Sequence, residues 1–378
     1  MANASGIIFS NLHNQNVPEL TRTRTIASIP FGCRYRLVDF ALSNMVNAGI
    51  SNVSVITHYN YQSLMDHLGS GKDWDLARRT GGLRVLPPFV TAFSNPTNTL
   101  YDNRLQALMS IKGAIARMPG DYIVISDCNA ICNIDLSEMI DRHIANGAKI
   151  TYAVKKLSLA GNMSQDFNII KSDPDGNIVD VLMHPSCYEG DTDISVNVAV
   201  ITREYLDRIL DEATSYGYTS LVKDVVRRKI GIEKMMVYRT DGYYQTILSL
   251  QDYFRCNMSL LDAKNRAELF KIKNRPVLTK VRNSAPTKYI DGCHVENSVI
   301  ADGCIIEGTV ENSVLFRGVV VEKGAVVRNS ILFQDTVVKE GASINYVITD
   351  KNVTLKGGVE LTSHPTMPLY VDKGKIIE

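Results

Sequence analysis

A six-residue period in the last part of the chain restricts its fold more than any other feature of the sequence. Aliphatic residues recur at this interval, and glycines and Asn-Ser pairs punctuate the runs. The aliphatic positions are Val299, Ile305, Val314, Val320, Val326, Leu332, Val338 and Ile344. We expect all of them to point inward, because stacked hexads bury one aliphatic residue per flat face as a continuous column. The period predicts a parallel β-helix, whereas a β-sandwich would show a period of two.

A β-helix of this kind serves either acyl transfer or assembly. Acyl transfer in such proteins uses a histidine base on a loop between coils. The histidines in this part of the chain are His294, at the first coil, and His364, in the tail. Because both lie outside the regular repeats, we expect an assembly role.

The first two-thirds of the chain alternates β-branched apolar runs with amphipathic stretches. Strands are predicted at residues 6–10, 53–57, 122–125, 150–154, 194–201 and 235–238. Helices are predicted at residues 37–48, 104–118, 136–146, 203–216 and 220–229, and a longer helical stretch at 248–270. The alternation predicts a Rossmann-like α/β domain with a mostly parallel sheet covered on both faces, and the turn residues at 173–177 indicate an inserted hairpin. We place this domain at residues 1–255, a linker at 256–285 and the β-helix at 286–378.

Composition excludes several classes of function. A net charge of +1 argues against a general binder of nucleic acid or anionic membranes. No basic leader precedes the first strand, and no apolar run approaches spanning length. Seven cysteines without a pairing rhythm predict a reduced, cytoplasmic setting. Cys128 and Cys132 form the only close pair, and their isolation predicts packing rather than a zinc site. We expect neither a metal nor a cofactor.

The segment after the first predicted strand lacks glycine. Many α/β proteins place a glycine-rich loop there, because glycine lets backbone N–H groups approach a phosphate. Here no glycine occurs between Gly6 and Gly32, and bulky amide and aliphatic side chains fill residues 11–20. The sequence therefore predicts a nucleotide-binding frame without its phosphate grip.

The segment 30–44 carries a family resemblance. It reads Pro-Phe-Gly-Cys-Arg-Tyr-Arg-Leu-Val-Asp-Phe-Ala-Leu-Ser-Asn and resembles the Phe-Gly-Gly-Lys-Tyr-Arg…Asp-Phe-Ala-Leu-Ser-Asn block of the glucose-1-phosphate adenylyltransferase (ADP-glucose pyrophosphorylase) family. Residues 47–50, 63–64, 71–76 and 86–88 continue the resemblance in order. It implies a GT-A-like nucleotidyltransferase domain followed by a left-handed β-helix. The chain is similar in particular to the GlgD-type companion chains of bacterial glycogen synthesis, because its departures from the family fall on the chemistry.

Family members make ADP-glucose from ATP and glucose 1-phosphate, and positioning and charge neutralisation by Mg²⁺, lysines and backbone donors dominate such transfers. Several of these charges are missing here. The position of the phosphate-binding lysine is Ile26, and the sugar-nucleotide segment 99–103 keeps only Asp102. The lysine that holds the sugar phosphate corresponds to His184, which is a poor substitute for a fixed positive charge.

The metal ligands are altered as well. The metal-binding strand end corresponds to residues 126–129, which leaves either Asp127 or Cys128 at the carboxylate position, and the second Mg²⁺ carboxylate corresponds to Thr246. Lys223 and Asp224 match the family's Gly-Lys-Asp segment. The resemblance therefore implies a degenerate active site with little or no activity.

Positive charge is retained at another site. The regulatory lysine of the family corresponds to Arg34, with Arg22 and Arg24 close in sequence. A guanidinium can bind phosphate bidentately, although such arginines are also often solvated or paired with local acids. We expect a non-catalytic subunit that assembles with an active homologue, as a tetramer, and responds to a sugar-phosphate effector. The alternatives are a diverged active sugar-1-phosphate nucleotidyltransferase and a stand-alone sugar-phosphate sensor.

Overall fold

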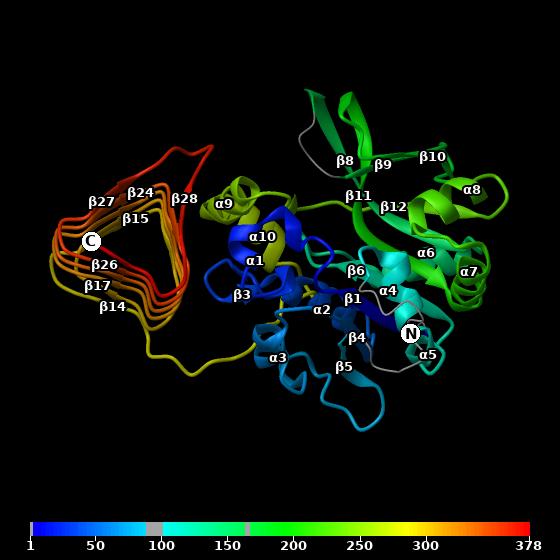
Figure 1. Ribbon diagram of the computed structural model, residues 1–378, viewed down its shortest axis with the longest axis horizontal. Coiled ribbons are helices and arrows are strands. Elements are labelled where there is room, and N and C mark those ends of the chain that lie inside the picture. The colour runs from blue at the N-terminus through cyan, green and yellow to red at the C-terminus, as the bar shows by residue number, and fades with distance from the viewer. Residues whose placement is uncertain (1–2, 88–100, 163–166) are drawn as a thin grey trace.

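The computed structural model describes residues 3–87, 101–162 and 167–378. An α/β domain and a triangular β-helix lie side by side, joined by the helices α9 (Leu250–Met258) and α10 (Ala263–Phe270) and an extended segment (Figure 1). In the α/β domain, β1 (Ala4–Phe9) pairs in parallel with β4 (Asn52–Ile56) on one side and β6 (Tyr122–Asp127) on the other. The strand β5 (Gly82–Leu86) extends this parallel half.

The other half of the sheet contains antiparallel pairs. The long strand β11 (Cys187–Thr202) runs antiparallel to β6 and to β8 (Ile150–Asn162), while β12 (Met235–Arg239) is parallel to β8. The predicted hairpin is formed by β9 (Asn168–Ser172) and β10 (Ile178–Met183). The sheet is therefore mixed and not mostly parallel. The chain runs from β8 to β11 without the helical crossover that two parallel neighbours require, so these two strands are antiparallel.

Helices cover both faces of the sheet, as predicted. Side chains alternate along β1, so Ile7 belongs to one apolar core and Ile8 to the other. The helices are α1 (Pro18–Thr21), α2 (Leu37–Asn47), α3 (Gln62–Leu68), α4 (Arg104–Ser110), α5 (Lys112–Ile115), α6 (Leu136–Ala145), α7 (Arg203–Tyr216) and α8 (Arg227–Lys229). The first core includes residues of α4, α5 and α7, and the second includes residues of α2, α3 and α6.

Most predicted helices form, but three are divided. The helix predicted at 104–118 is interrupted at Ile111, whose backbone (φ −111°, ψ 15°) is not helical. The segment predicted at 220–229 begins with a π-helical turn, Leu221–Val226, before α8. Between α9 and α10 a short 3₁₀ turn ends at Asp262, which is extended and caps α10 with its side chain. Helix α7 has the predicted bounds.

The C-terminal domain is a left-handed parallel β-helix with three sheets. The first sheet contains β14 (Lys288–Tyr289), β17 (Ile305–Ile306), β20 (Val320–Val321), β23 (Val337–Val338), β26 (Thr354–Leu355) and β29 (Ile376–Ile377). The second contains β15 (His294–Glu296), β18 (Thr309–Glu311), β21 (Val326–Arg328), β24 (Ser343–Asn345) and β27 (Glu360–Thr362). The third contains β16 (Val299–Ile300), β19 (Val314–Leu315), β22 (Ile331–Leu332), β25 (Val347–Thr349) and β28 (Leu369–Val371).

The expectation that every repeat residue points inward is wrong for part of the set. Ile305 is 37% exposed, whereas its neighbour Ile306 is fully buried. Val320 and Val326 likewise face outward, and Val314 is buried against the α/β domain. The cause is coil length: in the coils that hold the counted residues, equivalent residues lie 15 or 17 positions apart, so three strict hexads overshoot each coil and the counted residues drift between faces.

The third sheet packs its outer face on the α/β domain. Val314, Phe316, Ile331 and Phe333 share an apolar core with residues of α2, α9 and α10, and Tyr253 meets Phe333 edge-on with ring centroids 6.1 Å apart. The segment 256–285, expected to be a linker, contributes the buried Leu260 and Leu269 to this core. No helix in the described residues is long and apolar enough to span a membrane. All seven cysteines are free thiols.

Candidate functional site

The parallel strands β1, β4 and β6 end at one edge of the sheet, where α/β folds bind ligands. Asp127 is the last residue of β6 and is 2% exposed. Its carboxylate accepts hydrogen bonds from Arg104, at the start of α4, and lies 2.6 Å from Nε2 of His13. Burial alone would raise the pKa of Asp127, but Arg104 and His13 outweigh burial and hold it below its ordinary value. The carboxylate is therefore committed to an internal ion-pair cluster.

The residues that follow Asp127 lie close to Thr246, the residue predicted at the second metal position. Cys128 is buried in the core, and burial raises the pKa of its thiol well above the ordinary value, so it is a neutral packing group. Thr246, in β13 (Tyr244–Thr246), pairs with β7 (Ala130–Cys132), and its Oγ1 lies 3.4 Å from Nδ2 of Asn129. Asn129 Oδ1 also accepts a hydrogen bond from Asn197. Thr246 thus faces Asn129, a residue that sequence reasoning did not select.

These residues do not fit a Mg²⁺ site. Mg²⁺ binds through carboxylates and demands near-ideal octahedral oxygen geometry. Thr246 and Asn129 offer only neutral groups, and Asp127 is neutralised by Arg104. Among the described residues, no group of three or more His, Cys, Asp or Glu side chains could hold a metal ion.

The position predicted to correspond to the phosphate-binding lysine lies in an apolar core. Ile26 is 1% exposed and packs in the same core as Val17 and Leu20. Its backbone N–H donates to Oδ1 of Asn14 at 2.8 Å, which ties the glycine-free segment to itself. This position supplies no positive charge to a triphosphate.

Of the remaining site residues named from the sequence, some are exposed and one is hydrogen-bonded to the local backbone. Asp102 and His184 are exposed, and the sugar-nucleotide positions Thr99 and Leu100 lie outside the described residues. Lys223 is exposed. Asp224 accepts hydrogen bonds from the N–H groups of Thr219 and Ser220, which lower its pKa. Asp224 therefore fixes the start of the π-helical turn, which Ser220 caps.

A pocket, which we call the cationic pocket, lies between the two domains. It is lined by the cationic residues Arg34, Arg36, Lys280, Arg282, Arg317 and Lys351, together with Pro30, Cys33, Tyr35, His67, Phe316 and Gln334. None of these described lining residues is an acid. Arginine and lysine clusters of this kind bind phosphate and sulfate groups.

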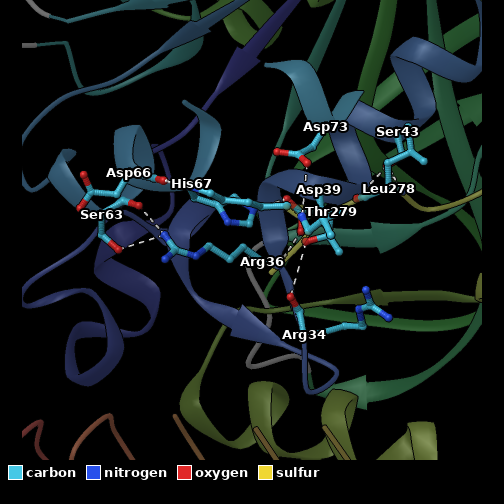
Figure 2. Close-up of polar contacts among 12 residues, drawn as sticks. Arg34, Arg36, Asp39, Ser43, Ser63, Asp66, His67, Asp73, Leu278 and Thr279 are labelled. Carbon is cyan, nitrogen blue, oxygen red and sulfur yellow. Dashed lines mark hydrogen bonds and ion pairs between the residues drawn. The ribbon is translucent and has the colours of Figure 1, made fainter. Parts of the chain in front are cut away.

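Local structure fixes the arginines of the α/β side. Figure 2 shows Arg36 reaching Ser63, to whose carbonyl and hydroxyl oxygens it donates, the latter at 3.0 Å. The backbone N–H of Arg36 donates to Asp39, whose other oxygen lies 2.6 Å from Nε2 of His67. Asp39 thereby caps α2. Arg34 is exposed, and its guanidinium carbon lies 5.9 Å from the Tyr35 ring centroid.

Acids compensate the positive charge of the pocket only in part: Arg317 is paired with Asp302 at 3.0 Å. Burial lowers the pKa of Arg36 to about 10, while Asp39 opposes this shift and Arg24 adds to it. Burial, followed by the charges of Arg36 and Arg24, lowers the pKa of Lys351 to about 7. A bound anion would relieve this repulsion, so the pocket is electrostatically prepared for one.

The arginines named from the sequence have different surroundings. Arg34 lines the pocket, but Arg24 is buried and paired with Asp350, and Arg22 forms an exposed pair with Asp372. Sequence reasoning missed Lys280, Arg282, Arg317 and Lys351, because only tertiary packing, of the segment before β14 and of the β-helix, brings them next to residues 34–36.

Comparisons with known proteins agree with both domains. The family model described as nucleotidyl transferase matches residues 15–262, and the one described as GlmU-like, C-terminal hexapeptide, matches residues 285–366. The chain is 36% identical to the glycogen biosynthesis protein GlgD of Geobacillus stearothermophilus over 325 residues, which cover 85% of this chain and 82% of that protein. It is 30% identical to the GlgD of Bacillus subtilis over the same shares of the two chains. A glucose-1-phosphate adenylyltransferase of Geobacillus stearothermophilus is 31% identical, over 82% of this chain and 79% of that enzyme.

The fold and the sheet edge define a nucleotidyltransferase-type domain carrying a hexapeptide β-helix. The chain belongs to the glucose-1-phosphate adenylyltransferase family, as the resemblance at residues 30–44 indicated.

Proposed function

We propose that this chain is a non-catalytic, regulatory subunit of ADP-glucose pyrophosphorylase in glycogen biosynthesis. It assembles with an active homologue and alters the rate at which that homologue makes ADP-glucose. The similarity to two proteins named glycogen biosynthesis protein GlgD supports this role.

One contrast carries the proposal. At the edge of the sheet, the metal and phosphate positions are neutral, apolar or internally paired: Thr246 and Asn129, Ile26, and Asp127. Between the domains, six cationic residues and no acid are among the described lining residues of the cationic pocket, although Arg317 is paired with Asp302 behind it. Chemistry on a triphosphate needs charge at the first site, whereas a regulatory anion needs charge at the second.

The consequence for catalysis can be estimated. Losing one preorganised charge-stabilising group costs on the order of 10²–10³ in rate, and losses within one constellation are not additive. The loss of a metal carboxylate and a phosphate lysine therefore reduces turnover by at least about 10²–10³-fold, the cost of one such group. The contribution of this chain is then binding and assembly.

The effector chemistry follows from the pocket. Lysines and arginines from both domains line one small cavity, whose charge suits a phosphate or sulfate group. An anion that contacts both domains biases the way they pack, and a shared interface transmits that bias to the active homologue.

The test mixes the purified chain with a purified active homologue and measures ADP-glucose synthesis against the molar ratio, with and without fructose bisphosphate. We expect the rate of ADP-glucose synthesis to change until it saturates at a fixed molar ratio of the two proteins. We also expect a complex larger than either protein alone. Replacing Arg34 by alanine should weaken the effector response, whereas the matched control Arg328→Ala, which removes an exposed arginine paired with Glu311, should not.

A stand-alone sugar-phosphate sensor is the second candidate, because the cationic pocket alone requires no partner. It predicts sulfate or bisphosphate binding with no effect on the homologue's rate or size. A rate that stays constant at every ratio would contradict the regulatory role.

A further inference from the structure

The three outer faces of the β-helix differ in what covers them. The third sheet packs against the α/β domain. The second sheet carries polar side chains outward, among them Glu311, Arg328 and Asn345. The first sheet, on the side marked by β14, β17 and β26 in Figure 1, faces away from the α/β domain.

That first sheet presents a continuous apolar row to its outside. Its ladder stacks Ile305 on Val320, Val320 on Val337, Val337 on Thr354 and Thr354 on Ile376. The residues that follow in the same strands, Ile306, Val321, Val338 and Leu355, are fully buried, so the stacked row points outward. Ile305 and Ile376 are 37% and 61% exposed. We call Ile305, Val320, Val337, Thr354 and Ile376 the apolar row.

A charged row runs beside it, two residues further along each strand. It consists of Glu307, Glu322, Lys339, Lys356 and Glu378, whose backbones stack through regular hydrogen bonds. Within the chain, Lys339 pairs with Glu322 at 2.6 Å, and Lys356 pairs with Glu378. The signs are ordered along the helix axis: acids on β17 and β20, then lysines on β23 and β26.

This order is self-complementary under a two-fold rotation. If a second copy packs face to face with its axis reversed, β20 meets β23 and β17 meets β26. Val320 then faces Val337 of the second copy, Glu322 faces its Lys339, and Glu307 faces its Lys356. At the ends, Lys288 faces Ile376 and Ile290 faces Glu378, so no like charges meet. Isologous contacts of this kind are the commonest in homo-oligomers.

The alternative packing, with the two axes parallel, does not match. Each strand would then face its own copy, and the apolar row would lie on the charged row, with Ile305 against Glu307. Burying carboxylates and ammonium groups against aliphatic side chains is unfavourable. Charge order therefore selects the antiparallel arrangement.

We propose that the apolar and charged rows of the first sheet pair with the same rows of a second copy of this chain, in antiparallel register. The contact buries the apolar row and forms a ring of Glu322 and Lys339 from both copies at the two-fold axis. It goes beyond the proposed regulatory function, because it joins two copies of this chain and does not involve the homologue.

Sedimentation equilibrium of the full chain, without any homologue, tests the contact. The wild-type chain should associate reversibly at micromolar concentration. Val337→Lys should raise the dissociation constant at least about a hundredfold, because each interface would bury two unpaired ammonium groups. The matched control Val326→Lys, an outward, half-buried valine of the second sheet, should leave the association unchanged. Circular dichroism confirms that both variants fold.

A charge swap tests the register. Glu307→Lys and Lys356→Glu should each weaken association about three- to thirtyfold, and the double variant should restore it. Within one chain these residues lie three strand spacings apart, about 14 Å, too far for an ion pair. Rescue therefore requires two copies.

The proposal is overturned if the wild-type chain is monomeric, if Val337→Lys associates as strongly as the wild type, or if the double variant does not restore association. If Val337→Lys blocks association only in mixtures with the active homologue, the face belongs to that contact. The self-pairing is then wrong, while the regulatory function stands.

Discussion

Arg24 of the α/β domain donates from Nη2 to both carboxylate oxygens of Asp350 in the β-helix, at 2.8 and 2.6 Å, with the two side chains 4% and 3% exposed. The hydroxyl of Tyr370 donates to the same carboxylate at 2.7 Å. The residue after Asp350 is Lys351, which lines the cationic pocket. This buried ion pair therefore holds together the two domains that form the walls of the pocket.

Removing one partner of this pair should destabilise the protein strongly. We expect Arg24→Ala to lower the free energy of unfolding by about 3–5 kcal/mol, because Asp350 is left as a buried, poorly compensated charge. Arg22→Ala is the matched control: Arg22 also pairs with an acid of the β-helix, but the two side chains are 67% and 41% exposed, so the loss should be about 0–1 kcal/mol. Urea unfolding followed by fluorescence of Trp74, the single tryptophan, measures both. Equal losses would contradict a special role for Arg24.

Asp127 should behave as a structural ion-pair partner with an acid-dependent contribution. Its pKa is lowered in the folded protein, so its stabilising effect is complete above the ordinary carboxyl pKa of about 3.9 and is lost as the pH falls through the folded value. Asp127→Asn should cost about 2–4 kcal/mol at neutral pH, because Arg104 loses its carboxylate. The difference in unfolding free energy between variant and wild type should shrink below about pH 4. A difference that stays constant down to pH 3 would show that another group carries the effect.

Anion binding in the cationic pocket should weaken as the pH rises through 7. The pKa of Lys351 is lowered to about 7, so this lysine is charged below and neutral above that pH in the anion-free protein. Sulfate is a suitable probe because its own charge is constant in this range. Calorimetry should show affinity falling by up to tenfold per pH unit above 7. Lys351→Arg, whose charge is fixed, should flatten the profile, and an unaltered slope in this variant would exclude Lys351 as the titrating group.

A rise in pH weakens anion binding through Lys351, but in the anion-free protein it increases the contribution of this lysine to folding stability. Its folded pKa lies below its unfolded value, so the unfolded chain binds more protons between about pH 7 and 10.4. The contribution of Lys351 to stability therefore rises with pH across this window, and its cost is largest below pH 7.

Asn129 and Thr246, which meet at the position that the family resemblance predicts for a metal, should accept a metal when both become carboxylates. We expect the double variant Asn129→Asp with Thr246→Asp to bind Mn²⁺ at least about tenfold more tightly than the wild type, because carboxylates are the preferred ligands of such ions. Each single variant should bind more weakly than the double. Calorimetric titration with Mn²⁺ measures this, and a double variant no better than the wild type would show that the two positions do not share an ion.

The fold could largely be predicted, because its signals are local and periodic. The period of aliphatic residues predicted the β-helix, and the amphipathic pattern predicted α7 to the residue. The register inside the β-helix could not be predicted from strict hexads, because coils of 15 or 17 residues shift the inward position. Ile305 was therefore expected inside and lies outside.

The assignment of Ile26 and Thr246 to altered site positions rests on the family resemblance and stays a prediction. The contacts that surround such positions could not be predicted from the sequence. Contacts such as Asp127 with His13, 114 positions apart, leave no mark in sequence spacing. The same holds for Asn129 beside Thr246, and for Lys351 beside Arg36, because tertiary packing alone brings these residues together.

Pyrophosphate release from Mg-ATP and glucose 1-phosphate shows whether the purified chain is catalytic. We expect a rate at least about 10²–10³-fold below that of an active homologue under the same conditions, and no further loss in Lys223→Ala. Robust release that disappears in Lys223→Ala or Asp127→Asn would contradict it, because those residues would then serve catalysis.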